Sequence, residues 1–355
     1  MEQKDIKAVY FIGAGGIGMS ALARYFMARG LVVAGYDKTP TPLTRQLERE
    51  GMLLHYEENT DEIPHVCKNS KACLVVYTPA IPADHAELRF FRDGGFCIEK
   101  RAQVLGELTR SHKGLCVAGT HGKTTTSAMC AHIMHQGHLD CNAFLGGIAK
   151  NYGTNYILSK SDYVVIEADE YDRSFHWLSP WISVVTATDP DHLDIYGTKQ
   201  AYLESFSKYT SLIQPGGALI MHTGLEMQPR LQQGVELYFD LCDLKDLPFC
   251  GTDLVIVISN LLDNAIRAAA QAKPPEVYLR ARRNEEEYLI SVRNRVQKDL
   301  ELVDGELPRS TKAEPGHGMG LVNVREVLDR CRCEYTLSCR DRWFRFTCAV
   351  PTRKL

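Results

Sequence analysis

Short runs of apolar, mostly β-branched residues alternate with stretches of helical periodicity along the first two thirds of the chain. One such series occupies residues 7–110, and a second begins near residue 114 and extends to about residue 222. Strand–helix alternation at this spacing predicts parallel, doubly wound sheets in two separate α/β domains. The predicted helices lie near Met19–Gly30, near Thr44–Gly51, from Asp84 onward, at Lys123–Gly137 and around Thr198–Leu212.

The pattern changes after Tyr238. A long helical stretch at residues 253–272 is followed by two strand-like runs, a polar loop, a further helix at 320–331 and two closing strands. This order is typical of an α+β sandwich. We therefore expect three domains, residues 1–110, 111–238 and 239–355, with an abrupt join near 238–243. A central sheet that stops there would leave an unpaired strand edge, which the following domain could cover.

Composition narrows the possible partners. The 355 residues are 45% hydrophobic and 24% charged, and the formal net charge is −3. Such a chain has no basic field that would neutralise a phosphate backbone, so nucleic acid is not an expected partner. No stretch of 18 apolar residues occurs, so no membrane segment is expected and we predict a cytoplasmic protein. The 12 cysteines are scattered singly, which favours reduced core cysteines.

The first glycine-rich loop follows an apolar strand and precedes a helix. Its glycines are Gly13, Gly15, Gly16 and Gly18, and Asp37 closes the next predicted strand. Glycines at these positions permit a tight turn and let backbone N–H groups approach a diphosphate, while an acidic residue at this spacing can bind a ribose hydroxyl. The loop alone is typical of NAD binding. It leaves open whether the ligand is NAD or another diphosphate.

A second glycine-rich loop also lies between a predicted strand and a predicted helix. Lys123 is placed to reach the β- and γ-phosphates of ATP, and the Thr124 hydroxyl to bind Mg²⁺. The loop is shorter than the general phosphate-binding pattern, because its two glycines are only three residues apart. Its candidate ATP-binding residues are Gly119, Thr120, His121, Gly122, Lys123, Thr124 and Thr125.

Five motifs in order carry a family resemblance over residues 8 to about 238. They read GAGGIGMSALA, GTHGKTTT, LGGIAKNYGTN, EADEYDRSF and TATDPDHLDIYG. This part of the chain resembles the Mur ligases, within them the branch that joins L-alanine to UDP-N-acetylmuramate in peptidoglycan synthesis. The resemblance implies that the first glycine loop binds the UDP diphosphate instead of NAD, with Asp37 near the uridine ribose.

The resemblance also implies the chemistry of the second loop. Joining a carboxylate to an amine requires activation of the carboxylate by phosphoryl transfer from ATP, which gives an acyl phosphate. Lys123 would hold the ATP phosphates, and two Mg²⁺ ions would offset charge on the transferring group. The implied metal positions are Thr124, Glu170 and His192, of which Glu170 and His192, with Lys123, are the implied catalytic residues, while Asp169 and Asp191 flank them in supporting positions.

The C-terminal part carries a different pair of motifs. Asn260 and Asn264 are four residues apart on a predicted helix, and a glycine loop precedes the next helix. These motifs resemble the histidine-kinase-type (GHKL) ATPase domain of quorum-sensing sensor kinases. The resemblance implies a second ATP site in which Asn264 binds Mg²⁺ and Asn260 assists at the phosphates. Its further candidate residues are Asn294, Gly316, Gly318 and Gly320.

Hydrolysing relatives of the GHKL domain carry a glutamate where Asn260 stands. An amide cannot accept a proton from water, so a phosphate donor is favoured over an ATPase. A rival interpretation treats the amide helix as the adenine-binding helix of a single ligase, but the asparagine spacing differs and the later glycine loop stays unexplained. Three hypotheses follow: a ligase impaired by a missing C-terminal ligase domain, a kinase-type domain that donates phosphate to a histidine of a partner, and a nucleotide-binding chimera without turnover.

Overall fold

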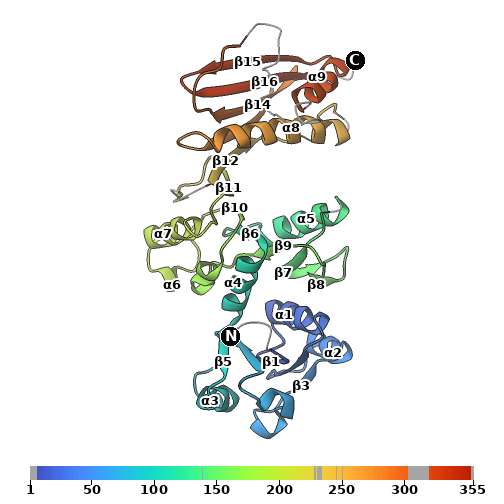
Figure 1. Ribbon diagram of the computed structural model, residues 1–355, viewed down its shortest axis with the longest axis vertical. Helices are drawn as coiled ribbons and strands as arrows, with labels where there is room; N and C mark the ends of the chain where they lie inside the picture. Colours follow the sequence, from blue (N-terminus) through green and yellow to red (C-terminus); the bar gives the residue numbers. More distant parts are fainter. Residues whose placement is uncertain are drawn as a thin grey trace. The chain divides into compact units, whose positions relative to one another are not determined.

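The computed structural model describes residues 6–137, 139–227, 229, 234–244, 246–249, 251–302 and 320–352. The chain divides into two compact units, Met1–Leu212 and Ile213–Leu355 (Figure 1). The first unit contains two sheets, and the second contains a sheet with helices on one face.

The first sheet of unit 1 is parallel throughout, in the order β3-β2-β1-β4-β5. All five residues of β1 are buried, as expected for a central strand with helices on both faces. Thr41 caps α2 in a capping box, and Pro42 occupies its first turn. The strands are β1 (Ala8–Ile12), β2 (Val32–Tyr36), β3 (Leu53–His55), β4 (Cys73–Tyr77) and β5 (Cys97–Lys100). The α-helices are α1 (Ile17–Ala28), α2 (Pro42–Arg49), α3 (Ala86–Asp93) and α4 (Arg101–Ser111), with short 3₁₀ turns at Thr60–Glu62 and His65–Lys68.

The other strands of unit 1 follow the order β10-β6-β9-β7-β8, and β10, β6, β9 and β7 run parallel. The strands are β6 (Lys113–Ala118), β7 (Asn142–Ala149), β8 (Thr154–Ile157), β9 (Tyr163–Glu167) and β10 (Ile182–Val185). The helices are α5 (Lys123–Gln136), the 3₁₀ segment η4 (Tyr171–Trp177), α6 (Leu193–Tyr196) and α7 (Lys199–Thr210). The antiparallel hairpin β7–β8 includes the glycine-rich motif at residues 145–155, and the sequence analysis named no strand there.

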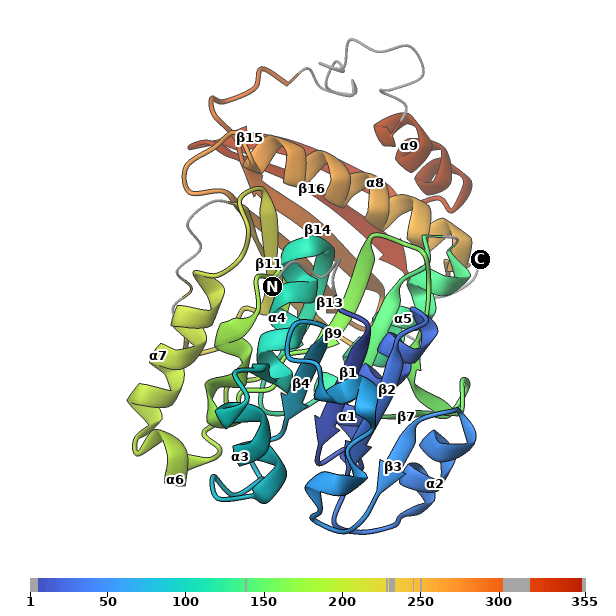
Figure 2. The same ribbon diagram turned by 60° about the horizontal axis from the view of Figure 1, so that its bottom comes forward.

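Asn155 joins the two sheets of unit 1. Its side chain is 1% exposed, and its Nδ2 atom donates to Ser20 Oγ over 3.1 Å and to the Ile17 carbonyl. Arg24 donates to Asn155 Oδ1 over 2.7 Å. Because Ile17 begins α1, this buried amide fixes the helix that follows the first glycine loop against β8. Figure 2 shows strands of both sheets of unit 1, with β1 and β2 in blue and β7 and β9 in green.

Unit 2 contains a mixed sheet in which β11, β12 and β13 run parallel and the remaining strands pair antiparallel. Its order is β15-β16-β14-β13-β12-β11. The strands are β11 (Gly217–His222), β12 (Gly234–Leu241), β13 (Glu276–Arg283), β14 (Glu287–Arg295), β15 (Glu334–Arg340) and β16 (Trp343–Pro351), and the helices are α8 (Gly251–Ala269) and α9 (Gly320–Arg330).

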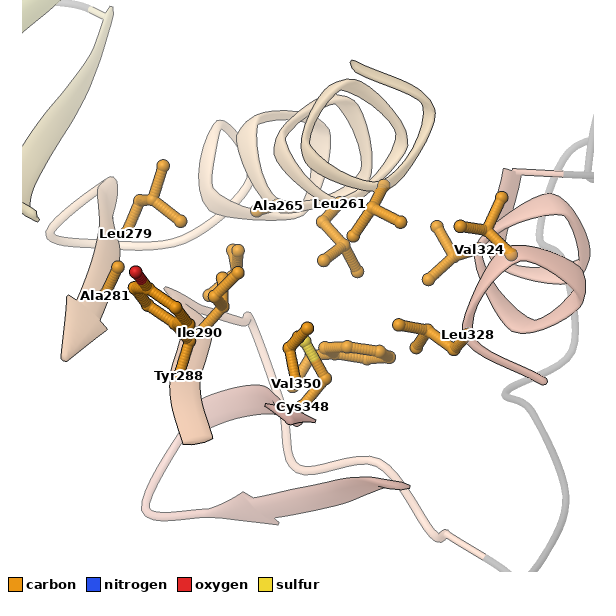
Figure 3. Packing of buried hydrophobic residues seen from close by; sticks show 14 of the residues in the cluster. Leu261, Ala265, Leu279, Ala281, Tyr288, Ile290, Val324, Leu328, Cys348 and Val350 are labelled. Atoms are coloured by element: carbon orange, nitrogen blue, oxygen red, sulfur yellow. The ribbon is translucent and has the colours of Figure 1, made fainter. Parts of the chain in front are cut away.

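One hydrophobic core fills the space between this sheet and its two helices. Alternate residues of β13, β14 and β16 face Leu261 of α8 and Val324 and Leu328 of α9, as Figure 3 shows. The α+β sandwich that the sequence predicted is thus confirmed, as are the two α/β parts before it. The buried sheet residues in view are Leu279, Ala281, Tyr288, Ile290, Cys348 and Val350.

The strand β12 crosses the position where the sequence pattern changes. It includes Tyr238, pairs with β11 on one side and pairs with β13 on the other. The strand edge that the sequence predicted to be unpaired is therefore covered by β13, the first strand of the C-terminal part.

Candidate functional site

The second glycine loop connects β6 to α5 in the way a phosphate-binding loop requires. Gly119 and Gly122 have φ of +131° and +80°, which favour glycine. A Cβ atom at Gly119 would lie 2.2 Å from Thr186 Oγ1, so the loop has no room for a side chain there. The Thr186 hydroxyl donates to the His121 carbonyl over 2.5 Å and fixes the turn from the neighbouring strand end.

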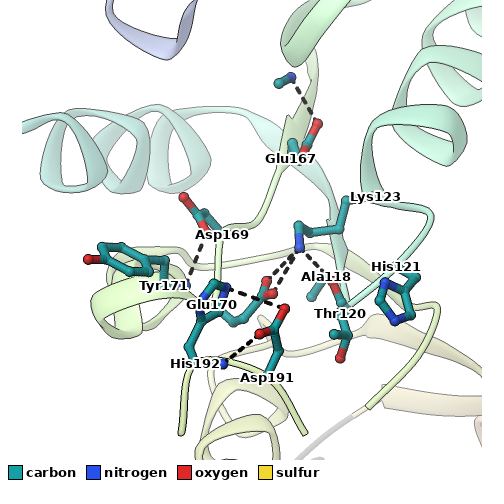
Figure 4. Close-up of polar contacts among 12 residues, drawn as sticks. Ala118, Thr120, His121, Lys123, Glu167, Asp169, Glu170, Tyr171, Asp191 and His192 are labelled. Carbon is teal, nitrogen blue, oxygen red and sulfur yellow. Dashed lines mark hydrogen bonds and ion pairs between the residues drawn. The ribbon is translucent and has the colours of Figure 1, made fainter. Parts of the chain in front are cut away.

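Lys123 begins α5 and points back into the loop (Figure 4). Its Nζ atom donates to the Gly119 carbonyl over 2.7 Å and forms an ion pair with Glu170 Oε2 at 2.8 Å. The Glu170 side chain is 1% exposed, so the pair is shielded from solvent on the carboxylate side. The ammonium group thus lies at the loop, where the phosphates of a nucleotide would bind.

Thr124, the predicted magnesium ligand, contacts a carboxylate that the sequence prediction missed. Its Oγ1 atom donates to Glu167 Oε1 over 3.0 Å, and the Gly146 backbone N–H donates to Glu167 Oε2 over 2.8 Å. A Cβ atom at Gly146 would lie 2.5 Å from the same carboxylate. A hydroxyl and a carboxylate side by side are oxygen donors that Mg²⁺ prefers, so this pair fits the metal. The signal available in the sequence was the position of Glu167 at the end of a strand next to the loop.

His192 lies in the left-handed region, with φ of +52°, at the start of α6. Its Nε2 atom is 3.7 Å from Asp191 Oδ2, and its ring contacts Tyr171 edge-on with centroids 5.2 Å apart. No hydrogen bond or ion pair joins His192 to Lys123, Thr124 or Glu170 within the described part of the chain. Glu170 and His192 therefore do not form one set of ligands with Thr124 in this structure.

The remaining predicted residues of the second loop support its shape. Thr120 Oγ1 donates to the Asp189 carbonyl over 2.7 Å and lies 2.8 Å from the Tyr202 hydroxyl. His121 and Thr125 are exposed at the loop and in the first turn of α5. Asp169 accepts a hydrogen bond from the Tyr171 N–H and lies 3.6 Å from Arg101.

The first glycine loop is held by Asp37. The Asp37 carboxylate accepts hydrogen bonds from the Gly15 N–H over 2.6 Å and from the Thr39 N–H over 3.1 Å. Gly13 has φ of +88°, and a Cβ atom at Gly18 would lie 2.4 Å from Arg101 Nη1. Asp37 thus stabilises the conformation of the loop through these hydrogen bonds, and its predicted role at a ribose stays a prediction.

The predicted second ATP site lies in unit 2, where α8 meets the start of α9. A Cβ atom at Gly320 would lie 2.9 Å from Asn260 Oδ1 and 3.5 Å from Asn264 Nδ2, so the structure brings these three residues together. Asn260 Nδ2 donates to the Ile256 carbonyl over 2.8 Å, which leaves Oδ1 directed toward Gly320. Asn294, on β14, is 2% exposed and donates to the Arg295 carbonyl. Gly316 and Gly318 lie outside the described residues.

The described residues include no helix long and apolar enough to cross a membrane. They also include no cluster of three or more histidine, cysteine, aspartate or glutamate side chains that could hold a metal ion.

Two glycine loops between parallel strands and helices, with a separate paired-amide helix, are typical of proteins that bind nucleotides. Residues 8–113 match the model of the Mur ligase family, catalytic domain, and residues 117–236 match the Mur ligase middle domain. Residues 251–351 match the GHKL domain. The chain therefore carries the N-terminal and middle domains of the Mur ligase family followed by a GHKL domain, a chimera-like architecture.

Curated relatives agree with the first two matches. The chain is 67% identical over 239 residues to the UDP-N-acetylmuramate–L-alanine ligase of Phocaeicola vulgatus, and 60% identical over 239 residues to that of Parabacteroides distasonis. Each alignment covers 67% of this chain and 52% of the relative. The chain thus spans about half the length of the curated relatives it matches.

Solved structures share the fold. The chain is similar to UDP-N-acetylmuramate:L-alanyl-γ-D-glutamyl-meso-diaminopimelate ligase from Neisseria meningitides, with a TM-score of 0.58 and 25% identity, over 65% of this chain and 78% of that chain. It also matches the fold of UDP-N-acetylmuramate-alanine ligase from Thermotoga maritima, with a TM-score of 0.56 and 24% identity, over 91% of this chain and 65% of that chain.

Proposed function

We propose that residues 8–236 form the UDP-sugar and ATP sites of an ATP-dependent ligase of peptidoglycan synthesis, which acts in the cytoplasm. The substrates would be UDP-N-acetylmuramate and L-alanine, which the names of the curated relatives specify for those proteins. The observation that carries the proposal is the second glycine loop, where Lys123 and the Thr124–Glu167 pair lie at the start of α5.

In this reaction the terminal phosphoryl group of ATP passes to the carboxylate of the sugar acid. Lys123 would neutralise the phosphate oxygens, and binding of ATP would require it to exchange its contacts with Gly119 and Glu170 for the nucleotide. Thr124 and Glu167 would hold Mg²⁺, which offsets charge on the transferring group. The amine of L-alanine would then attack the acyl phosphate and form the amide as phosphate leaves.

Asn155 supports the same proposal because the two substrates must meet. It ties α1, which follows the first glycine loop, to β8, and β8 pairs with β7, the strand whose Gly146 N–H donates to Glu167 beside the second loop. Positions fixed within an ångström keep two bound reactants in line for transfer. Asp37 would keep the first loop in the shape that receives the diphosphate.

We propose that the whole chain turns over slowly, because its likeness to the ligases ends near residue 240 and a GHKL domain follows. The domain borders would lie near residues 110 and 238. A second candidate function rests on the contact of Asn260 and Asn264 with Gly320: a kinase-type ATP site that passes phosphate to a histidine of a partner. If neither reaction proceeds, the chain is a nucleotide-binding chimera.

Phosphate release tests these alternatives on the full chain. The ligase proposal expects release from Mg-ATP that is slow and requires both UDP-N-acetylmuramate and L-alanine, and that Lys123→Ala abolishes. Transfer of labelled phosphate to a separately supplied histidine-bearing helical hairpin, lost in Asn264→Ala, would favour the kinase-type function instead. Release that is unaffected by omission of the sugar acid would contradict the ligase proposal.

A further inference from the structure

One face of the unit 2 sheet carries arginines interleaved with aromatic rings. Successive side chains of a strand point to opposite faces, and the face toward α8 and α9 is taken up by the hydrophobic core (Figure 3). The intervening residues therefore lie on the open face. The strand registers place Tyr238, Tyr278, Arg293 and Arg345 in one row across the strands and Arg295 opposite Trp343 in the next row, and these six residues are named here the arginine ladder.

Stacking contacts order the ladder. The rings of Tyr238 and Tyr278 stack with centroids 4.7 Å apart and planes at 14°. The Cζ atoms of Arg293 and Arg295 lie 3.8 Å and 4.1 Å from the centre of the Trp343 ring. These contacts hold the guanidinium planes in place and leave the N–H groups of Arg293 as available donors, while Arg295 Nη1 also donates to the Asp341 carbonyl over 3.4 Å.

The ladder is also short of negative charge. Arg293 lies directly opposite Arg345 in the pairing of β14 with β16, and like charges directly opposite destabilise a sheet. Burial, then the charge of Arg345, lowers the pKa of Arg293. Glu276 lies 3.6 Å from Arg295, but no carboxylate pairs with Arg293 or Arg345 among residues that the structure describes.

The nearby carboxylates are already engaged. Asp240 accepts hydrogen bonds from Arg282 and lies 3.2 Å from Arg280, while Glu236 accepts one from the Tyr238 hydroxyl. These acidic groups belong to β12, so the uncompensated positive charge is confined to β14 and β16. Local conflicts of this kind are expected at functional sites, and a surface that binds an acidic partner is one such site.

We infer that the arginine ladder is a docking surface for an acidic polypeptide segment, whose carboxylates would engage the N–H edges of Arg293, Arg295 and Arg345. Fixed guanidinium forks match carboxylates in pairs of parallel hydrogen bonds. Single-stranded nucleic acid fits less well, because its bases need free aromatic faces and those of Trp343 and Tyr278 are occupied.

Binding of a fluorescent ten-residue glutamate peptide to the full chain, followed by anisotropy at low ionic strength, tests the inference. We expect saturable binding that Arg345→Glu weakens by about tenfold, the loss of roughly one charge-assisted contact. The matched control is Arg325→Glu, an equal charge change on exposed α9, which should bind as the parent chain does. Equal loss in both variants, or none in Arg345→Glu, would overturn the inference.

Two further measurements distinguish a docking role of Arg345 from a structural one, and an acidic peptide from a nucleic acid as the ligand. Arg345→Thr removes the like-charge pair without a reversal of charge and should raise the midpoint of thermal unfolding while it weakens peptide binding. A lower midpoint would show that the guanidinium group serves the fold and would contradict a docking role. Tighter binding of a ten-residue thymidine oligonucleotide than of the glutamate peptide, with the same dependence on Arg345, would also overturn the acidic-polypeptide assignment.

Discussion

Three carboxylates lie close together at the end of β9 and directly after it, and each makes different contacts in the structure. Glu167 contacts Thr124 and the Gly146 N–H, Asp169 caps the Tyr171 N–H beside Arg101, and Glu170 pairs with Lys123. The sequence prediction had given the magnesium role to Glu170. We propose instead that Glu167 shares the metal with Thr124 and that Glu170 holds the lysine.

Exchange of Glu167 for glutamine tests this division. The variant keeps the size of the side chain but loses the charge that a metal ligand needs, so we expect Mg-ATP affinity to fall about tenfold or more. ATP binding without Mg²⁺ should change little. Calorimetry with and without the metal checks this, and Glu204→Gln on the exposed face of α7 is the control. Equal losses in both conditions would show that Glu167 only shapes the loop.

A buried carboxylate beneath the first sheet makes stability depend on pH. Glu87 accepts a hydrogen bond from the Tyr10 hydroxyl over 2.7 Å, the same hydroxyl lies 2.6 Å from His55 Nε2, and burial raises the pKa of Glu87 to about 7. Because the folded chain holds this proton more tightly than the unfolded chain, the group stabilises the fold below about pH 4.5. That stability is lost as the pH rises through about 7.

Glu87→Gln should remove this dependence. As the pH rises from about 4.5 to 7, the free energy of unfolding of the parent chain should fall relative to that of the variant by up to about 3 kcal/mol. The unfolding midpoint of the parent chain should fall with it. Burial also lowers the pKa of His55 and of His85, so these two histidines make the fold more stable as the pH rises. Both proteins contain them, and their contribution therefore largely cancels when the two proteins are compared. Thermal unfolding across this range checks the slope, and parallel curves for the two proteins would contradict the role of Glu87.

At the scale of the elements, β12 determines how the two parts of the chain join. It lies between β11, the last strand of the Mur ligase-like alternation, and β13, the first strand after α8. Central strands of a sheet need a backbone donor at each position, and a parallel strand without a partner on one side invites association with other chains. The Mur ligase-like part and the C-terminal part of the chain are thus joined by one continuous sheet within unit 2.

Tyr238→Pro should disrupt this join. Proline removes a backbone donor in the middle of β12 and so disrupts the pairing of this central strand; we therefore expect unit 2 to unfold at a lower temperature and to lose its proposed ATP site. Tyr238→Val keeps the backbone donor and loses the stacking on Tyr278 and the hydroxyl bond to Glu236, so it serves as the control for the side chain. If the proline variant unfolds as the valine variant does, β12 is not a required part of the unit.

At the scale of the whole molecule, periodicity was sufficient to predict the α/β and α+β parts and the strand–loop–helix context of both glycine loops. It could not predict the hairpin β7–β8, whose glycines serve close contacts such as Gly146 with Glu167 instead of an alternating face. It could not predict that β12 would pair on both sides either, because pairing between distant segments leaves no local signal. The compact units meet at residues 212 and 213, whereas the pattern changes near residue 238. The predicted domain borders therefore stay predictions.

The central claim is that one chain holds two separate nucleotide sites. Calorimetric titration of the full chain with Mg-ATP tests it most directly, alongside Lys123→Ala and Asn264→Ala. The account predicts two sites in the parent chain, of which each variant loses its own and keeps the other. A single site, lost in only one of the two variants, would contradict it and would show which half of the chain binds no nucleotide.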